Sequence, residues 1–181
     1  MRPNLQRQMI ICMKSCLPLT NRPTTRLTID SSMLQKIKNQ YGGGRSCSEI
    51  GTGCSIDLHD LNCVVLKGED QAQNSEKMCD CFIFDDRDTL TIHLVELKST
   101  TSHASDIEEK FKNSLNRCNR ILAMISPNKQ YTPKLVLAAR SYRHIESRIP
   151  KRMVIRINNK KLYHLNLEKC GLKLSRICKT K

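Results

Sequence analysis

Tryptophan is absent from this chain of 181 residues, and aromatic side chains make up only 4% of it. Long hydrophobic runs are absent too, since no apolar stretch approaches the roughly 20 residues that a membrane-spanning helix needs. The short run Met9–Met13 is followed by Lys14, which makes it a poor core for a secretion signal. With 39% hydrophobic residues, the chain is expected to form one domain with its own core and no membrane segment.

Several motifs that indicate a particular chemistry are also missing. No HExxH zinc pattern is present. The triplet Gly42-Gly43-Gly44 lacks the remaining residues of a phosphate-binding loop, so it is interpreted as a helix breaker. No local motif combines a Ser or Cys nucleophile with a His base.

The ten Cys residues form no CxxC pair, so zinc-ribbon spacing is lacking. Several of them lie inside apolar patterns, where free Cys acts as a small hydrophobic residue: Cys63, Cys79, Cys81 and Cys118. We therefore expect a reducing, cytoplasmic setting rather than a disulfide framework. The alternative left open is an iron–sulfur or zinc site built from Cys47, Cys54 and Cys63.

Acidic residues are scarce beside basic ones, since 17 Asp and Glu against 31 Lys and Arg give a net charge of +14. Such an excess favours a polyanionic partner, most simply nucleic acid, over a basic surface that serves solubility alone. Residues 1–29 hold five of the basic residues and no acid. Residues 1–26 are therefore interpreted as an irregular basic arm that touches phosphates, with a transit sequence as the alternative, and residues 27–181 as a single domain.

The remaining pattern predicts alternating helices and strands. The expected elements are a helix over Asp30–Tyr41, a short helical turn over Ser46–Thr52, strands over Asn62–Lys67, Met78–Asp85 and Thr91–Lys98, a helix from Ser105 that stops before Pro127, a strand over Lys134–Ala139, and a hairpin of Met153–Ile157 with Lys161–Leu167. The two central strands are nearly continuous in apolar residues, which is typical of a sheet buried on both faces. The class is therefore α/β, with a central sheet flanked by helices and an extra C-terminal hairpin.

Three ionisable residues stand at the ends of the two central strands. Asp80 opens the first strand, and Glu96 and Lys98 close the second. Burying charges at the edge of a core costs free energy unless a metal or a partner compensates, so a functional role is favoured over solvated strand-end charges. Since side chains two apart on a strand share a face, Glu96 and Lys98 point the same way and Leu97 points opposite.

The connection between these strands is interpreted as a solvated hairpin. Its acids lack the spacing and the Gly of a calcium loop: Asp85, Asp86 and Asp88. His93 lies between Ile92 and Leu94, and we expect a packed histidine rather than a ligand.

The set of Asp80 on one strand, Glu96-Leu97-Lys98 on the next and an amphipathic helix after them resembles the PD-(D/E)xK nuclease superfamily, which has the restriction-endonuclease-like fold. The resemblance covers roughly residues 46–140. It implies an α-β-β-β-α-β core with a mixed sheet, and metal-dependent hydrolysis of phosphodiester bonds.

For the site itself, the resemblance implies a metal-binding and catalytic set of three acids and one backbone carbonyl: Asp80, Glu96, Glu49 and Leu97. Oxygen ligands of this kind suit Mg²⁺ or Mn²⁺. Lys98 is expected to orient the attacking water and to offset charge in the transition state. One departure is Cys79, which stands where the family pattern has Pro.

Contacts to nucleic acid, DNA favoured over RNA, are expected from four basic residues: Lys110, Arg117, Arg140 and Arg143. For the helical residues among them, a solvated face is the alternative. The sequence thus predicts a Mg²⁺-dependent endonuclease, with a catalytically inactive nucleic-acid-binding or partner-binding protein of the same fold as the rival. Many enzymes of this fold cut two strands as dimers, so a homodimer or a larger complex fits the resemblance.

Overall fold

A computed structural model gives the fold, and it describes residues 31–49, 53–59, 61–87, 89–98, 103–140, 154–157 and 161–177. The helices in these ranges are α1 (Ser31–Tyr41), α2 (Gly68–Gln71), α3 (Ala104–Ile125) and α4 (Leu174–Ile177). The strands are β1 (Cys47–Ser48), β2 (Ser55–Ile56), β3 (Cys63–Lys67), β4 (Cys81–Asp85), β5 (Thr91–Lys98), β6 (Thr132–Ala139), β7 (Val154–Ile157) and β8 (Lys161–Lys169). The basic arm expected over residues 1–26 lies outside the described residues.

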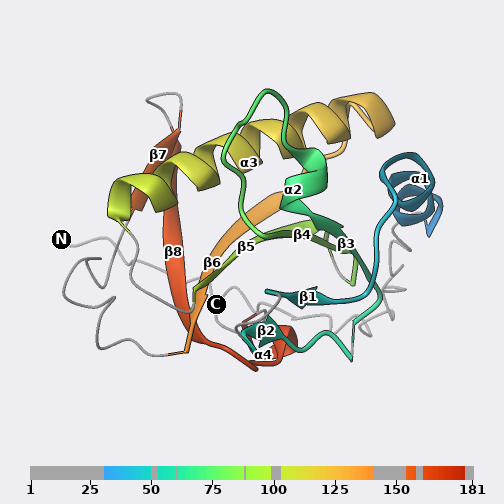
Figure 1. Ribbon diagram of the computed structural model, residues 1–181. Helices are drawn as coiled ribbons and strands as arrows, with labels where there is room; N and C mark the ends of the chain where they lie inside the picture. Colours follow the sequence, from blue (N-terminus) through green and yellow to red (C-terminus); the bar gives the residue numbers. More distant parts are fainter. Residues whose placement is uncertain are drawn as a thin grey trace, which may run out of the picture.

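Six of the strands form one mixed sheet in the order β3-β4-β5-β6-β8-β7 (Figure 1). Neighbours β3, β4 and β5 are antiparallel, whereas β5, β6 and β8 run parallel, and β7 joins the edge as an antiparallel partner of β8. Parallel neighbours need a crossover, and α3 provides it between β5 and β6. The predicted α/β class, mixed sheet and C-terminal hairpin are confirmed.

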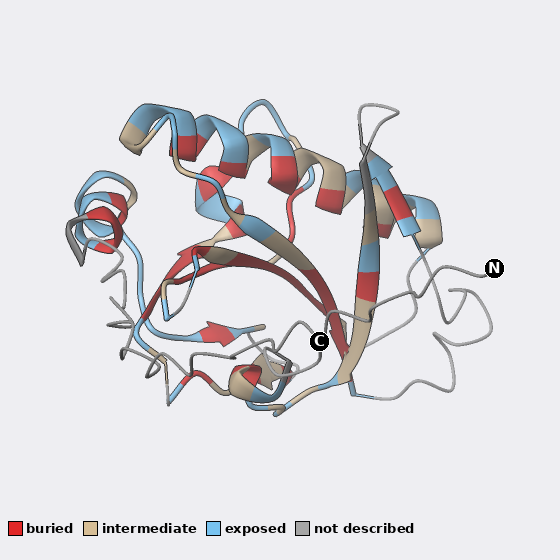
Figure 2. Ribbon diagram, turned by 180° about the vertical axis from the view of Figure 1, so that it is seen from behind, coloured by how far each residue is buried: buried red, intermediate tan, exposed pale blue. Residues whose placement is uncertain are grey.

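The sheet is covered on both faces. α3 crosses one face, with α1 near its C-terminal end, and β1, β2 and α4 lie on the opposite face (Figure 1). On the α3 side, Phe82 and Leu94 join the core with Phe111. On the other side, Ile83 and Leu97 do so. Both faces of the central strands are therefore apolar, and Figure 2 shows these strands as a continuous buried layer.

Helix α3 begins at Ala104, one residue before the predicted start, and ends at Ile125. Its buried positions include most of the predicted apolar stripe: Ile107, Phe111, Leu115, Cys118 and Leu122. Most outward positions are polar or charged, and Met124 near the C-terminal end is an exposed exception. No described helix is both long and apolar enough to cross a bilayer.

The segment before β3 differs from the prediction. A helical turn was expected over Ser46–Thr52, but β1 and β2 form a small antiparallel ladder in which Cys47 faces Ile56. Cys47, Cys54 and Ile56 are buried in the core on this side of the sheet. The cause is tertiary, because these side chains gain burial as strands that a lone helical turn would leave in solvent.

Two disulfides hold this ladder to the rest of the molecule, Cys47–Cys81 and Cys54–Cys170. The expectation that Cys81 is a free thiol is therefore wrong, as is a metal site built from Cys47 and Cys54. Three other cysteines are free and buried as predicted: Cys63, Cys79 and Cys118. Disulfides are typical of oxidising compartments, so they do not favour the reducing cytoplasm, which stays a prediction.

Removing either disulfide is expected to lower the free energy of unfolding by about 2–4 kcal/mol, because each bond restricts the unfolded chain. The Cys54–Cys170 bond spans 116 residues and the Cys47–Cys81 bond spans 34, so the first should contribute more. Denaturant unfolding of the two double Cys→Ser variants measures this. Equal midpoints for wild type and both variants, under oxidising conditions, would contradict the pairing.

The hairpin acids also differ in part from the prediction. Asp85 is buried at the end of β4 rather than solvated, and Arg87 Nη2 pairs with its Oδ2 at 2.8 Å. Burial alone would raise the pKa of Asp85, but contacts from His93 and Arg87 bring it well below its ordinary range. His93 is fully buried within β5, which confirms the packed histidine.

Candidate active site

The strand register brings Asp80 and Glu96 to the same place. β4 and β5 pair antiparallel with Phe82 opposite Leu94. Continuing this register by two residues places Asp80 opposite Glu96, at the point where β4 begins. Phe82 and Leu94 belong to the core on the α3 side, so alternation directs Asp80 and Glu96 to that side as well. The two acids predicted to share a site therefore lie on one face of the sheet.

Asp80 is held by contacts from elements on either side of it. The Gly68 N–H donates to the Asp80 carbonyl at 2.9 Å, and the Cys79 N–H donates to Ser114 Oγ of α3 at 2.9 Å. At Gly68, a Cβ atom would come within 1.6 Å of the Cys79 carbonyl oxygen, so any side chain there forces the backbone apart. This close approach fixes the chain immediately before the carboxylate.

Leu97 links the two strand ends through its backbone. β4 begins at Cys81, so Leu97 of β5 lies beyond the ladder and has no backbone partner in β4. Its N–H donates instead to Asp80 Oδ2 at 2.6 Å. The N–H and C=O groups of one strand residue point to the same edge. The Leu97 carbonyl therefore also points past the start of β4, on the side of Asp80, as the predicted ligand set requires.

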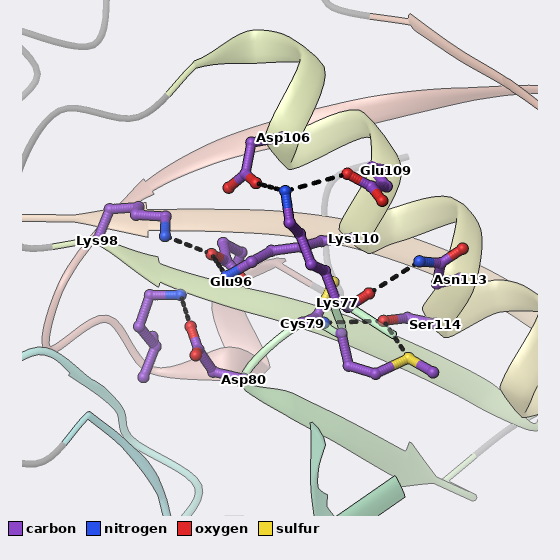
Figure 3. Close-up of polar contacts among 12 residues, drawn as sticks. Lys77, Cys79, Asp80, Glu96, Lys98, Asp106, Glu109, Lys110, Asn113 and Ser114 are labelled. Carbon is purple, nitrogen blue, oxygen red and sulfur yellow. Dashed lines mark hydrogen bonds and ion pairs between the residues drawn. The ribbon is translucent and has the colours of Figure 1, made fainter. Parts of the chain in front are cut away.

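Glu96 is the centre of a small cluster of charges (Figure 3). Its side chain is fully buried, and its Oε1 forms an ion pair with Lys98 Nζ at 2.6 Å and accepts a hydrogen bond from Lys110 Nζ at 2.7 Å. Lys98 comes from the same strand, two residues on, and Lys110 comes from α3. Both lysine side chains are 18% exposed, so the cluster has limited contact with solvent.

The pKa shifts of these groups are caused first by burial. Burial raises the pKa of Glu96, and the Asp80 charge adds to that rise although Lys98 and Lys110 oppose it. Burial also raises the pKa of Asp80, against the hydrogen bond from Leu97. For Lys110, burial lowers the pKa, but the hydrogen bond and charge of Glu96 bring it above its ordinary value. A further cation between the acids would lower their electrostatic cost.

Glu49 approaches the same place from the β1–β2 ladder. Its N–H donates to the Cys54 carbonyl at 3.0 Å, and its charge contributes to the raised pKa of Asp80. Glu49, Asp80 and Lys110 all line a cavity of about 570 Å³. The third predicted acid is thus near Asp80, although it lies beside a strand rather than on a helix.

The donor atoms fit a divalent cation. Glu96 Oε2 is buried and has no hydrogen-bond partner among the described residues. Asp80, the Leu97 carbonyl and Glu96 offer the oxygen atoms that Mg²⁺ and Mn²⁺ prefer. In the arrangement seen, no three His, Cys, Asp or Glu side chains of the described ranges already gather as a metal site. Instead, Glu96 Oε1 is paired with the ammonium groups of Lys98 and Lys110, so binding of a metal ion to that oxygen requires rotation of a lysine side chain.

The predicted nucleic-acid contacts are spread unevenly around the site. Lys110 is part of it, and Arg140 is exposed at the end of β6, where its N–H donates to the Lys98 carbonyl at 3.3 Å. Arg117 lies two helical turns beyond Lys110, roughly 10 Å further along α3. Arg143 lies outside the described residues. Lys110 and Arg140 are therefore the two that flank the acids.

Some residues that build the site have little or no signal in the sequence. In the sequence, Ser114 interrupts the apolar stripe of α3 with a polar residue. In the structure it is buried, and its Oγ accepts from the Cys79 N–H, which holds the chain before Asp80. Lys77 is an exposed residue that lines the cavity, and its Nζ pairs with Asp106 and Glu109 of α3 at 2.8 and 3.3 Å. A serine breaking an otherwise apolar helical stripe was the one available hint.

Comparison with family models, with curated proteins and with solved structures returned no match to this chain.

Proposed function

We propose that the protein is a metal-dependent nuclease of restriction-endonuclease-like fold, with DNA favoured over RNA as its substrate. The observation that carries the proposal is the convergence of Asp80, Glu96 and Lys98 on one face of the sheet, with Glu96 fully buried. Two acids and an amine at adjoining strand ends form a site that can hold a divalent cation and position a water molecule.

The order of elements supports the fold part of the proposal. The helix α1, the antiparallel strands β3, β4 and β5, the helix α3 and the parallel strand β6 follow one another as in an α-β-β-β-α-β core. The ladder β1–β2 and the short helix α2 are additions to that core. The site lies where β4 begins and β5 ends, which is the expected place of the two motifs.

Each residue has a chemical role in the proposed reaction. When bound, a divalent cation would supply Lewis-acid activation of the phosphate and a more acidic water. Asp80, Glu96 and the Leu97 carbonyl would hold that ion, and Glu49 adds negative charge to the cavity. The Lys98 ammonium group orients the attacking water and offsets charge on the transition state.

The basic excess supports a polyanionic substrate. A net charge of +14 draws phosphate groups to the protein over several ångströms, and Arg140 lies exposed beside the end of β5. The rival is a protein of the same fold that binds nucleic acid or a protein partner without cleaving. A homodimer or a larger complex is part of the proposal for double-strand cleavage.

Incubation with nucleic acids tests the function directly. Supercoiled plasmid, linear duplex, single-stranded DNA and RNA are each mixed with the protein and Mg²⁺, Mn²⁺ or EDTA. We expect cleavage of DNA with Mg²⁺ or Mn²⁺ and none with EDTA. Binding to these substrates without cleavage of any of them, with either metal, would favour the inactive rival.

Metal binding should also stabilise the fold, and more so at higher pH. The raised pKa values of Asp80 and Glu96 mean that protonation stabilises the metal-free fold at low pH. That contribution is lost as pH rises through the folded values, where Mg²⁺ can replace the proton. At about 100 times its Kd, Mg²⁺ should add ~2.7 kcal/mol to the free energy of unfolding.

Thermal unfolding at about pH 5 and about pH 8, with and without Mg²⁺, measures this difference. Asp80→Asn is the control, because it keeps an acceptor for the Leu97 N–H but lacks the charge. A Mg²⁺ shift that is equal in wild type and Asp80→Asn would show that the ion binds elsewhere.

A further inference from the structure

Lys110 and Lys98 form ion pairs with the same oxygen atom of Glu96. Lys110 Nζ lies 2.7 Å and Lys98 Nζ lies 2.6 Å from Glu96 Oε1, whereas Glu96 Oε2 is buried without a hydrogen-bond partner in the described ranges. Two ammonium groups are therefore crowded at one end of the carboxylate and none is at the other. Both lysines also lower the pKa of Asp80, so two cations serve two neighbouring acids although both ammonium groups lie on Glu96.

A divalent ion at this carboxylate would face strong repulsion from both ammonium groups. Like charges a few ångströms apart repel even when water screens them, and more strongly in a buried cluster. The ion therefore weakens at least one of the two lysine contacts when it binds. The geometry identifies which of the two is free to leave.

Lys98 is tied to Glu96 by the strand itself, since residues two apart on β5 share a face. Lys110 instead reaches Glu96 from α3 and also lines the cavity beside Asp80. Its stem can rotate toward that cavity without any change in the sheet. Lys110 is thus the lysine that can turn from the acid to the space where a phosphate would lie.

We propose that Lys110 changes partners during the reaction. In the metal-free protein it is the counter-ion of Glu96, and when the divalent ion binds, it turns to the substrate phosphate. The two partners are alternatives, so the ammonium group keeps the site compact before metal binds and stabilises negative charge on the phosphate afterwards. This role rests on the proposed nuclease function, and it goes beyond that function by adding to Lys98 of β5 a second lysine, carried by α3, that acts in the reaction.

The first test measures metal affinity without activity. Lys110→Met keeps the length of the side chain but removes the competing charge, so Mg²⁺ should stabilise this variant at about tenfold lower concentration than wild type. Thermal unfolding midpoints across a Mg²⁺ titration give that apparent affinity. Lys112→Met is the matched control, because Lys112 lies on the same helix and pairs at the surface with Glu108 at 2.7 Å. Unchanged Mg²⁺ dependence in Lys110→Met would overturn the exchange.

The second test measures turnover at saturating Mg²⁺. If Lys110 contacts the phosphate, Lys110→Met should stay about 10²-fold slower than wild type in kcat even when the metal site is full. Lys110→Arg should recover part of that loss and, with its charge retained, should show the Mg²⁺ affinity of wild type. Full kcat of Lys110→Met at saturating Mg²⁺ would overturn the phosphate role and leave a counter-ion only.

Failure of the nuclease proposal is distinguishable from failure of this one. If wild type cleaves no nucleic acid, the function fails, while the Mg²⁺ titration still reports whether Lys110 competes with the ion. If wild type cleaves and Lys110→Met behaves as Lys112→Met does in both tests, the function stands and the exchange fails. If Lys110→Met does not fold, Lys110→Gln, which keeps a hydrogen-bond donor for Glu96, takes its place in both tests.

Discussion

The Glu96→Gln variant is expected to lose metal-dependent cleavage, with a fall in kcat on the order of 10³-fold or more. Glu96 is the fully buried acid that pairs with both lysines. Its second oxygen, Oε2, is a buried potential metal ligand with no hydrogen-bond partner among the described residues. A neutral amide in its place gives up one unit of negative charge toward the ion. No other described acid of the site is as deeply buried.

The same change should leave the fold intact. Gln has the shape of Glu, and its amide oxygen can still accept the hydrogen bond from Lys110. Because burial raises the pKa of Glu96, the ionised acid is costly in the metal-free protein, so its neutralisation removes a penalty as well as two charged contacts. We expect a thermal midpoint close to that of wild type without metal.

A plasmid-cleavage assay with Mg²⁺ and binding of a labelled duplex in EDTA together measure the effect. Glu108→Gln serves as the control, since Glu108 lies on the exposed side of α3 and pairs only with Lys112 among the ion pairs described. Retained cleavage by pure Glu96→Gln protein would remove Glu96 from the reaction and with it the proposed site.

The parts of the fold that the sequence predicts well are those in which local pattern and tertiary packing agree. β5 has the predicted bounds, Thr91–Lys98, because its β-branched and apolar residues suit a strand that is buried on both faces. α3 has the predicted stripe, because a period near four residues lets one face bury against the sheet. β4 is shorter than predicted, since Met78–Asp80 run outside the ladder and are held by α2 and α3.

The β1–β2 ladder could not be predicted from its own residues. Its strands are two residues long, and what stabilises them is burial of Cys47 and Cys54 with disulfides to distant parts of the chain. Cysteine spacing does not determine pairing, since ten cysteines allow many connectivities. The predicted helical turn at Ser46–Thr52 was wrong for this reason.

The part of the candidate site that could be predicted from the sequence is the part whose geometry follows from strand alternation and register. Glu96 and Lys98 share a face because they lie two apart on one strand, and Asp80 joins them because a short hairpin fixes the register. The bond from Lys110 to Glu96 depends instead on how α3 crosses the sheet, which no local pattern encodes. The prediction for Asp85 was wrong for a similar reason, since it contacts Arg87 after the strand end and His93 of the neighbouring strand β5.

Lys98→Ala is expected to separate catalysis from binding. Turnover should fall by roughly 10²–10³-fold, because the ammonium group that offsets charge beside the phosphate is removed. Affinity for DNA should barely change, since Lys98 is one of 31 basic residues and is only 18% exposed. Lys36→Ala is the control, because Lys36 is an exposed residue of α1 that carries the same charge away from the site.

Binding itself should weaken steeply with salt in all three proteins. Contacts to about 6–10 phosphates would lower the affinity by ~10³–10⁵ between about 50 and 200 mM salt, through the release of counterions. Binding and cleavage of one labelled duplex are measured across this series for wild type, Lys98→Ala and Lys36→Ala. Parallel salt slopes with cleavage lost only in Lys98→Ala would assign the lysine to the chemical step. Steep salt dependence without metal-dependent cleavage by wild type would favour the inactive binding protein, and salt-independent binding would make the charge of +14 a solubility feature alone.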